Sequence, residues 1–387
     1  MAALRSPAGR AVLAEIGRYD GAAAIALAAR LRAAGHPAEL VAAALTQARL
    51  RDRARAKFGA EANRMLFTAD GLEQATRASV AGHRARRFAG VGRVADLCCG
   101  IGGDLIALAR PGAALHSGSL VGVESDPLTA AVARANASEF GLAARVDCAD
   151  AISVDLTAYD AVFLDPSRRA GGRRIFDPAA YRPPWSFVEQ VLRGDACVKV
   201  APGLPHDRIP AGVEAEWVSD AGAVKELAMW SGAFVTTTRR ATLLPSGATL
   251  TDTGCGAPPV RAPQRWLYEP DGAVIRAGLV ADVAALVDGA LLDPRIAYLT
   301  APDRVPTPFA TAYEVTDVLP FSLRRLRTLL RGRDIGVVTV KKRGSAIEPE
   351  TLRRQLKLSG SGHAVVVVTR IGQAPTALVC RPPQPRA

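Results

Sequence analysis

The sequence predicts an α/β protein centred on a doubly wound, mostly parallel sheet, with a helical segment before it and a smaller α/β domain after it. Three observations predict this fold. An apolar strand runs into a glycine-rich turn and a helical pattern at 94–110, three more apolar strands follow, and an acidic residue closes each of those three. Open α/β sheets bind ligands at the carboxyl ends of their strands, so we expect the functional site there.

Residues 1–75 are predicted to form a helical segment ahead of the sheet. Its first 60 residues are rich in alanine, carry apolar residues at helical spacing, and are broken by turn-forming residues at 19–21 and 35–37. A basic run follows at 49–57, where Arg or Lys occupies every second position. Such a run is either a solvated helix face or a contact for phosphate groups, and the sequence leaves both interpretations open.

Two further helices are predicted between this run and the first strand. Thr68 or Asp70 can cap the first of them, and the second carries His83.

The core domain, predicted over 76–250, opens with the strand and glycine turn at 94–104. Gly100, Gly102 and Gly103 lack the Cβ atoms that would keep the backbone away from a ligand, and the N–H groups that begin the next helix carry partial positive charge. A small anionic group is therefore expected there. Leu105 stands where the dinucleotide fingerprint has its third glycine, so a carboxylate is a better candidate than a pyrophosphate.

The following strands place acidic residues at their ends. Glu124 ends the strand 120–124, where a doubly wound sheet places an acceptor for ribose hydroxyls. Asp126 is expected to cap a helix that begins with Pro127. Asp150 ends the strand 145–150, and Asp165 follows the strand 161–164.

A glycine turn after the first strand and an acidic residue at the end of each of the next three strands occur here in order, over roughly residues 75–245. This pattern resembles the class I S-adenosylmethionine-dependent methyltransferases, which have a Rossmann-like core. The resemblance implies that S-adenosylmethionine is the cofactor, with its methionine part on the first loop, its ribose at the second strand and its adenine at the third. The cofactor-binding residues that it implies are Asp96, Cys98, Gly100, Gly102, Glu124, Asp126, Asp150 and Asp165. The segment before the first strand resembles that of trimethylguanosine synthase-like RNA methyltransferases, where a helix with a histidine covers the cofactor. His83 is accordingly a candidate lid residue, with a merely packed or exposed histidine as the alternative.

In this family the loop after the fourth strand faces the methyl acceptor. Amino methyltransferases commonly have Asp or Asn there, then two prolines and an aromatic residue, whereas this chain keeps Asp165 and Pro166 and continues Ser-Arg-Arg. Arg168 can replace the ring, because a guanidinium stacks on a base or binds a phosphate in bidentate fashion. The predicted catalytic residues are therefore Asp165, Pro166 and Arg168. Arg168, Arg169 and Trp185 are predicted RNA contacts, and the alternative for Trp185, which the sequence favours, is that it anchors its own loop.

The cysteines bear on a second kind of transfer. An Asp-Pro-x-Arg loop also resembles carbon-5 pyrimidine methyltransferases, which need a nucleophilic cysteine. Cys197 lies in the strand 196–200 among apolar residues, where a thiolate is disfavoured, so we favour direct transfer. The six cysteines include no Cys-x-x-Cys pair, and we expect buried free thiols and no metal site.

A Gly- and Pro-rich stretch at 250–265 is predicted to link the core to a last domain, 265–387. Helices are expected at 277–286 and 323–330, and strands at 335–340, 364–368 and 377–380. The order of elements resembles the THUMP-like domain that follows such methyltransferases in some bacterial proteins, and THUMP modules proper bind RNA.

The last domain also carries three basic clusters, at 324–333, 341–343 and 353–357. They are either a phosphate-binding surface or solvated faces, and Lys341, Lys342 and Arg343 are the candidate RNA contacts among them. The net charge of +12 favours a nucleic acid, but a bias toward Arg and Ala can also come from the base composition of the coding sequence.

No run approaches the roughly 18 apolar residues of a membrane span, and charged residues interrupt the first 20 positions. We therefore expect a cytoplasmic S-adenosylmethionine-dependent methyltransferase with no membrane partner. Its predicted substrate is a nucleotide in structured RNA, such as tRNA or rRNA. The alternatives are a methyltransferase of a small molecule or protein, and an RNA-binding protein that retains the cofactor fold without turnover.

Overall fold

A computed structural model describes residues 2–110, 119–167, 169–170, 173–174 and 181–383. The chain forms two compact units, one of residues 1–214 with 226–236 and the other of residues 215–225 with 237–387. Arg168 lies outside the described residues. So do eight positions of the Gly-, Pro- and Arg-rich stretch 170–187 that follows it, namely 171–172 and 175–180.

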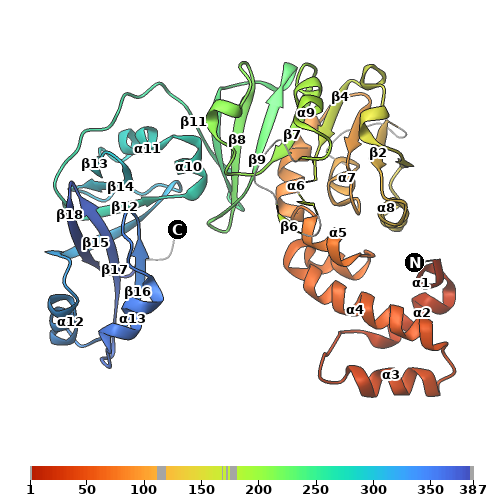
Figure 1. The fold of residues 1–387 in the computed structure, drawn as a ribbon, viewed down its shortest axis with the longest axis horizontal. Coiled ribbons are helices and arrows are strands. Elements are labelled where there is room, and N and C mark those ends of the chain that lie inside the picture. Colours follow the sequence, from red (N-terminus) through yellow and green to blue (C-terminus); the bar gives the residue numbers. More distant parts are fainter. Residues whose placement is uncertain (1, 111–118, 168, 171–172, 175–180, 384–387) are drawn as a thin grey trace. The chain divides into compact units, whose positions relative to one another are not determined.

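The chain begins with a helical segment, drawn red to orange in Figure 1. Its helices are α1 Ala2–Arg5, α2 Pro7–Ile16, α3 Ala24–Ala33 and α4 Ala38–Phe58. The breaks around 19–21 and 35–37 are confirmed. The short helix α1 was not predicted. It is separate from α2 because Ser6 starts a new helix by accepting a hydrogen bond from the Gly9 N–H at 3.0 Å. Leu4, Val12, Leu31 and Val41 form the core of this segment.

A short helical turn, η1 Gly59–Asn63, leads to α5 Ala69–Gln74, α6 Ala78–Ala85 and the turn η2 Arg86–Phe88. Thr68, one of the two predicted caps, accepts the hydrogen bond from the Gly71 N–H at 3.0 Å. Phe58, Phe67 and Leu72 from these elements pack with Ile101 and Val132 of the sheet domain.

The sheet of the first unit has its strands in the order β9-β7-β4-β1-β2-β3. The strands are β1 Val94–Leu97, β2 Leu120–Glu124, β3 Ala144–Cys148, β4 Ala161–Leu164, β7 Ala196–Val200 and β9 Ala223–Ser231. All run parallel except β9, which is antiparallel to β7. The strands predicted at the start of 94–104 and at 120–124, 145–150, 161–164 and 196–200 are confirmed, but β3 ends two residues before Asp150.

Helices and short elements connect these strands. They are α7 Gly103–Leu108, α8 Pro127–Glu139, η3 Ala151–Ser153, η4 Leu156–Ala158, β5 Arg169–Ala170, β6 Arg173–Arg174, α9 Trp185–Val191, η6 His206–Arg208 and η7 Gly232–Phe234. Phe88, Leu105, Phe163 and Trp230 lie in the core around the sheet and are almost completely shielded from solvent. Because the parallel strands are in register from Val94 onward, their carboxyl ends meet along one edge of the sheet.

The second unit begins with β8 Glu214–Asp220, β10 Arg239–Leu244 and β11 Ala248–Thr251, followed by α10 Gly272–Ala277 and α11 Val280–Leu286. The single helical stretch predicted over 277–286 is wrong. Gly278 takes a left-handed φ of 73° and ends α10, so a new helix has to start at Val280. Strand β11 was not predicted.

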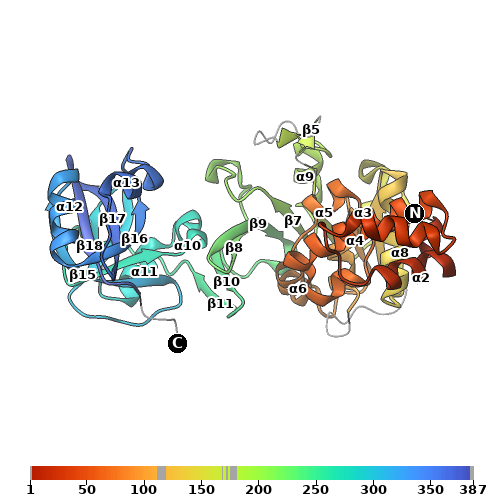
Figure 2. The ribbon, with the colours of Figure 1, turned by 90° about the horizontal axis from the view of Figure 1, so that it is seen from below.

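A seven-stranded sheet completes this unit, in the order β13-β14-β12-β15-β18-β17-β16. Its strands are β12 Trp266–Pro270, β13 Ala290–Asp293, β14 Ile296–Ala301, β15 Ala310–Pro320, β16 Ile335–Lys342, β17 Gly362–Ile371 and β18 Ala374–Cys380. Helices α12 Leu323–Gly332 and α13 Pro349–Leu356 pack together against the β16–β18 part (Figure 2), where Leu326, Leu330, Leu352 and Leu356 meet Val366 and Val368. The last three strands and α12 are confirmed, whereas β12 to β15 were not predicted.

Candidate functional site

A cavity of about 590 Å³ lies at the carboxyl ends of β1, β2, β4 and β7. Most of the predicted site residues meet here although they come from different parts of the sequence. Those that line it are Asp96, Cys98, Gly100, Glu124, Asp126, Asp150, Asp165 and Pro166. Gly102 is not among the lining residues, and Arg168 lies outside the described part of the chain.

The glycine turn forms one wall of this cavity. Gly100 and Gly102 have φ angles of 57° and 84°, which glycine adopts without strain, and Gly102 is the N-cap of α7. The Gly100 N–H donates a hydrogen bond to Glu124 Oε2 at 3.0 Å, and the Asp126 N–H donates to Glu124 Oε1 at 2.9 Å. Glu124 therefore fixes the glycine turn to the start of α8.

Asp126 and Asp150 act as helix caps at the cavity rim. Asp126 Oδ2 accepts hydrogen bonds from the Thr129 N–H at 2.7 Å and from the Thr129 hydroxyl at 2.6 Å, and these bonds lower the pKa of the Asp126 carboxyl. Asp150 is exposed and accepts a hydrogen bond from the Ile152 N–H at 3.0 Å. Both carboxylates keep oxygen atoms that can accept further hydrogen bonds from a ligand.

Asp96, in the middle of β1, differs from the other acids of the cavity. It is completely buried, and neither of its carboxylate oxygens has a hydrogen-bond partner among the described residues. Burial raises the pKa of Asp96 well above its usual range, and the charges of Asp104 and Asp165 raise it further. A buried carboxylate without a partner costs free energy, so this position favours a cationic ligand group.

The overall charge of the cavity also favours a cationic ligand. Eight acidic residues line it, against the two basic residues Arg182 and Lys199. Such a cavity attracts a ligand that carries positive charge and repels a pyrophosphate.

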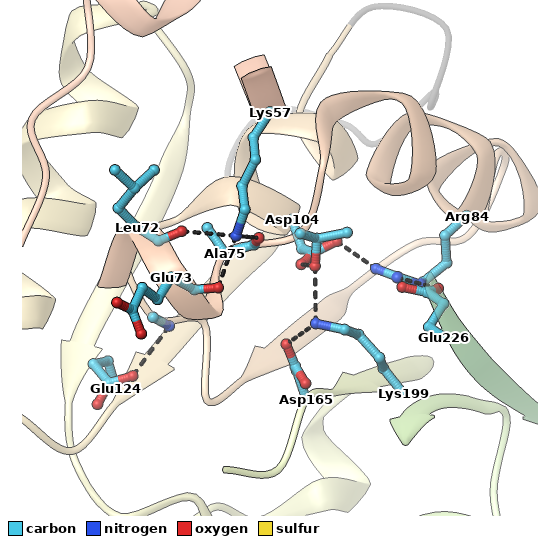
Figure 3. Close-up of polar contacts among 12 residues, drawn as sticks. Lys57, Leu72, Glu73, Ala75, Arg84, Asp104, Glu124, Asp165, Lys199 and Glu226 are labelled. Carbon is cyan, nitrogen blue, oxygen red and sulfur yellow. Dashed lines mark hydrogen bonds and ion pairs between the residues drawn. The ribbon is translucent and has the colours of Figure 1, made fainter. Parts of the chain in front are cut away.

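An ion network that the sequence did not predict lies at the back of the cavity (Figure 3). Arg84 of α6 contacts both Asp104 and Glu226, and Lys199 of β7 contacts Asp165. Thr76 joins the two pairs, since it donates to Asp104 Oδ2 at 2.6 Å and accepts from Lys199 Nζ at 3.0 Å. The available signal was a lysine inside the otherwise apolar strand 196–200.

Lys57, the last residue of the basic run, faces the protein and not the solvent. Its Nζ donates to the carbonyl oxygens of Leu72, Glu73 and Ala75 at 2.8, 2.7 and 2.8 Å (Figure 3). These carbonyls lie at the carboxyl end of α5, whose residues form another wall of the cavity. Lys57 thus holds that wall in place.

The predicted lid residue His83 and the predicted RNA contact Trp185 do not line the cavity. His83 is half-buried in α6, with its Nδ1 3.1 Å from the Arg86 guanidinium. Trp185 begins α9 and packs edge-on against Tyr181 at 5.9 Å between ring centroids. Arg169 lies in the short strand β5. Pro166 is buried beside a backbone bridge between Ser167 and Arg182 that brings residues 182–184 to the cavity.

The cysteines are free, as expected, but not all are buried. Cys148 and Cys255 are exposed, so the expectation of buried thiols is wrong for these two, which lie at a strand end and in the 250–265 stretch. Cys197 is completely buried in β7, where a pyrimidine could not reach its sulfur. Burial raises the pKa of the Cys98 thiol, the cysteine that lines the cavity.

The candidate RNA contacts of the second unit are largely engaged by their own chain. Lys341 Nζ lies 2.5 Å from Glu269 Oε2, and Lys342 pairs with Glu348. The Arg343 guanidinium lies over the Tyr298 ring at 5.3 Å. These contacts leave less free charge at 341–343 than the sequence suggested.

The sheet order, the antiparallel last strand and the cavity at the strand ends define a class I methyltransferase fold. Two relatives from Mycobacterium tuberculosis, strains CDC 1551/Oshkosh and ATCC 25618/H37Rv, are each named as an uncharacterised S-adenosylmethionine-dependent methyltransferase. Each is 41% identical over 352 residues, which is 86% of this chain and 95% of the relative. The chain belongs to this family of S-adenosylmethionine-dependent methyltransferases.

Other comparisons cover the fold and the ends of the chain. The crystal structure of a proposed methyltransferase from Porphyromonas gingivalis W83 matches with a TM-score of 0.75 and 22% identity, over 89% of this chain and 91% of that one. Residues 310–382 match the model of the THUMP domain-like family, and residues 1–54 match that of a domain of unknown function, DUF8688. The predicted fold class, with its THUMP-like part, is confirmed.

The cavity fits S-adenosylmethionine, the cofactor of this family. Its two cationic centres, an ammonium and a sulfonium, suit the excess of acidic residues and the unpartnered carboxylate of Asp96. Within the described residues no group of three or more His, Cys, Asp or Glu side chains could hold a metal ion. Over the same residues, no helix has the length and apolar character that crossing a membrane requires.

Proposed function

We propose that this methyltransferase modifies a nucleotide in structured RNA, such as tRNA or rRNA, in the cytoplasm. The observation that carries the proposal is the THUMP domain-like match at 310–382 in the same chain as the methyltransferase core. THUMP modules proper bind RNA, and the proposed division is a helical segment over 1–75, a catalytic domain over 76–250 and the THUMP-like domain over 265–387.

The proposed cofactor site consists of residues that line or support the cavity. Glu124 and Asp126 accept the ribose hydroxyls, Asp150 faces the adenine, and the glycine turn with Gly100 and Gly102 leaves room for the methionine part. Asp96 and Cys98 complete the floor of the site. The bound cofactor supplies a methyl group that is already activated for transfer, so the protein has to provide position and a proton acceptor.

Asp165 is the proposed acceptor of a hydrogen bond from the target nitrogen or oxygen. Its carboxylate lies at the end of β4 and is held by Lys199, which leaves the other carboxylate oxygen for the substrate. The Pro166 carbonyl is proposed as a second acceptor, and Arg168, Arg169 and Trp185 as contacts for the base or its phosphate. No nucleophilic cysteine is needed for transfer of this kind.

A small molecule or protein substrate is the second candidate. The observation that favours it is the internal pairing of Lys341 and Lys342, which weakens the case for a phosphate-binding surface there.

The test compares nucleosides from cells with and without the protein by mass spectrometry. An RNA methyltransferase leaves one methylated nucleoside that disappears on deletion and returns with the wild-type gene but not with Asp165→Asn. Unchanged nucleosides, together with a methylated protein or metabolite that follows the gene, would establish the second candidate.

A further inference from the structure

A second cavity, of about 570 Å³, lies among the helices of the first unit, away from the sheet edge. Residues of α1, α2, α4 and α8 line it, and none of them lines the methyltransferase cavity. Its volume is in the range of ligand-binding cavities, about 300–1,000 Å³. Nothing in the methyl-transfer chemistry makes use of it.

The charge of this cavity is opposite to that of the first. Six arginines line it, against only two acidic residues, Asp52 and Glu139. The arginines are Arg5, Arg10, Arg18, Arg51, Arg55 and Arg64. They come from segments on both sides of α3, so folding has brought like charges together around one cavity. Arg51 is partly buried and the other five are exposed, so an anion can reach all of them from the solvent.

The two acidic residues form ion pairs with two of the six arginines, and the charge of Glu139 also attracts Arg51. Arg55 Nε lies 4.0 Å from Asp52 Oδ1, and Arg64 Nε lies 3.7 Å from Glu139 Oε1. Arg64 also covers the Phe140 ring, with its guanidinium carbon 4.4 Å from the ring centroid. These two guanidinium groups are therefore partly neutralised within the cavity.

The other four lack such ion pairs in the part of the chain that the structure describes. Arg10 Nη1 donates to the Arg5 carbonyl at 2.6 Å, and Arg51 Nε donates to the Met65 carbonyl at 2.9 Å. Both bonds use only part of a guanidinium that has five donors. Among the residues that the structure describes, the side chains of Arg5 and Arg18 make no hydrogen bond or ion pair. The free donors of four arginines thus remain around one cavity.

A phosphate group matches this arrangement. A guanidinium binds two phosphate oxygens in bidentate fashion, and several such groups around a cavity accommodate successive phosphates of a polynucleotide. Tyr19 and the apolar side chain of Leu13 line the same cavity and offer surfaces for a sugar or a base. The basic clusters of the second unit, by contrast, are partly neutralised by ion pairs with Glu269, Glu348, Asp317 and Glu350.

We infer that this cavity binds backbone phosphates of the RNA substrate, so that the N-terminal helical segment is a docking site separate from the methyl-transfer cavity. The inference rests on the proposed function, because it takes the substrate to be RNA. It gives residues 1–54, matched to a domain of unknown function, a role in substrate binding.

The test uses the full chain and two double variants of equal charge. Arg10→Gln with Arg18→Gln changes the cavity, whereas Arg30→Gln with Arg32→Gln removes the same charge from α3, where both residues are exposed and do not line the cavity. Fluorescence anisotropy with a labelled tRNA is measured across a salt series, and calorimetry with S-adenosylmethionine reports on the first cavity. A thermal-shift titration with tripolyphosphate gives the response to a small anion.

The cavity variant should bind the tRNA about tenfold more weakly, with a salt dependence flattened by about 0.7–0.9 log units for each lost contact. The α3 variant should lose much less affinity, and both should bind S-adenosylmethionine as the wild type does. Equal tRNA affinity and salt slope for the two variants would overturn the inference and leave the proposed function standing. Loss of only the tripolyphosphate response would also overturn it and assign the cavity to a small phosphorylated ligand. A wild-type chain that binds no RNA would overturn the proposed function itself.

Discussion

Lys199 and Asp165 form an ion pair across the neighbouring parallel strands β7 and β4, at the edge where both strands end. The Lys199 side chain is 8% exposed and that of Asp165 is 23% exposed, so the pair is partly shielded from water. Thr76 binds the same lysine and links it to Asp104. The acid proposed to face the methyl acceptor is thus oriented by a residue that the sequence did not single out.

The coupling between Lys199 and Asp165 can be measured in a double-mutant cycle. Asp165→Asn should abolish methyl transfer while the affinity for S-adenosylmethionine changes little, because the acid acts at the reacting centre. Lys199→Met should lower kcat by about 10–100-fold through misplacement of Asp165, and should cost about 1–3 kcal/mol of stability, since Asp165 loses its partner. The double variant should be more stable than the sum of the single effects predicts. Additive losses in denaturant melts would show that the two residues act independently.

Replacing Glu124 with Ala should weaken the binding of S-adenosylmethionine. Glu124→Ala removes the acceptor for the Gly100 and Asp126 N–H groups as well as the proposed ribose contact, and each charged hydrogen bond is worth about 1.5–3 kcal/mol. The affinity for S-adenosylmethionine in calorimetry should fall at least tenfold.

Two controls accompany the Glu124 experiment. Asp147→Ala removes an acid of β3 that does not line the cavity and should leave binding unchanged. NADH should not bind the wild type, because its pyrophosphate meets an acidic cavity. Tight NADH binding without S-adenosylmethionine binding would contradict the assignment of the site.

Replacing Asp96 with Asn should raise the stability of the free protein at pH 8 and lower its affinity for S-adenosylmethionine. Its pKa is raised in the folded state, so below about pH 4 the carboxyl is protonated in both folded and unfolded chains and Asp96→Asn should be as stable as the wild type. As the pH rises, the unfolded carboxyl ionises first and the wild type loses stability relative to the variant, up to the folded pKa. At pH 8 the variant should therefore melt higher but bind S-adenosylmethionine more weakly. A variant that melts lower at pH 8 and equally at pH 4 would reverse the sign and show that Asp96 is stabilised as an anion.

Lys57 predicts that one residue of the basic run is structural. Lys57→Met removes three donors from the carboxyl end of α5, so the melting temperature should fall and the affinity for S-adenosylmethionine should drop several-fold. Arg49→Met, from the same run, serves as the control because Arg49 is exposed and lines neither cavity. If the two variants behave alike, Lys57 has no special part in holding that wall.

The fold of the first unit could be predicted because its signals are local. The glycine turn, the Asp126 cap and the apolar strands up to 200 are each written in a few consecutive residues, and the structure has all of them. The break at Gly278 and the strands β12 to β14 were missed because short segments carry too few residues for a clear periodicity. Strand β15 has 11 residues, but only Ala310 and Tyr313 of it are buried, so it lacks the alternation of a half-buried strand.

The ion network could not be predicted for a different reason. Thr76 and Lys199 are separated by 123 residues, and Arg84 and Glu226 by 142, so no spacing in the sequence relates them. The arginine cavity has the same origin, since Arg5, Arg18 and Arg64 meet only once the helices have folded. The sequence did show the basic run, but not that Lys57 turns inward while Arg51 and Arg55 face the cavity.

RNA methylation is tested most directly by transfer of a labelled methyl group from S-adenosylmethionine to purified total RNA by the full chain. We expect label in one modified nucleoside after nuclease digestion, present with the wild type and with Asp147→Ala and absent with Asp165→Asn. Absence of label from the RNA with the wild type, or equal label with Asp165→Asn, is the result that rules out this function.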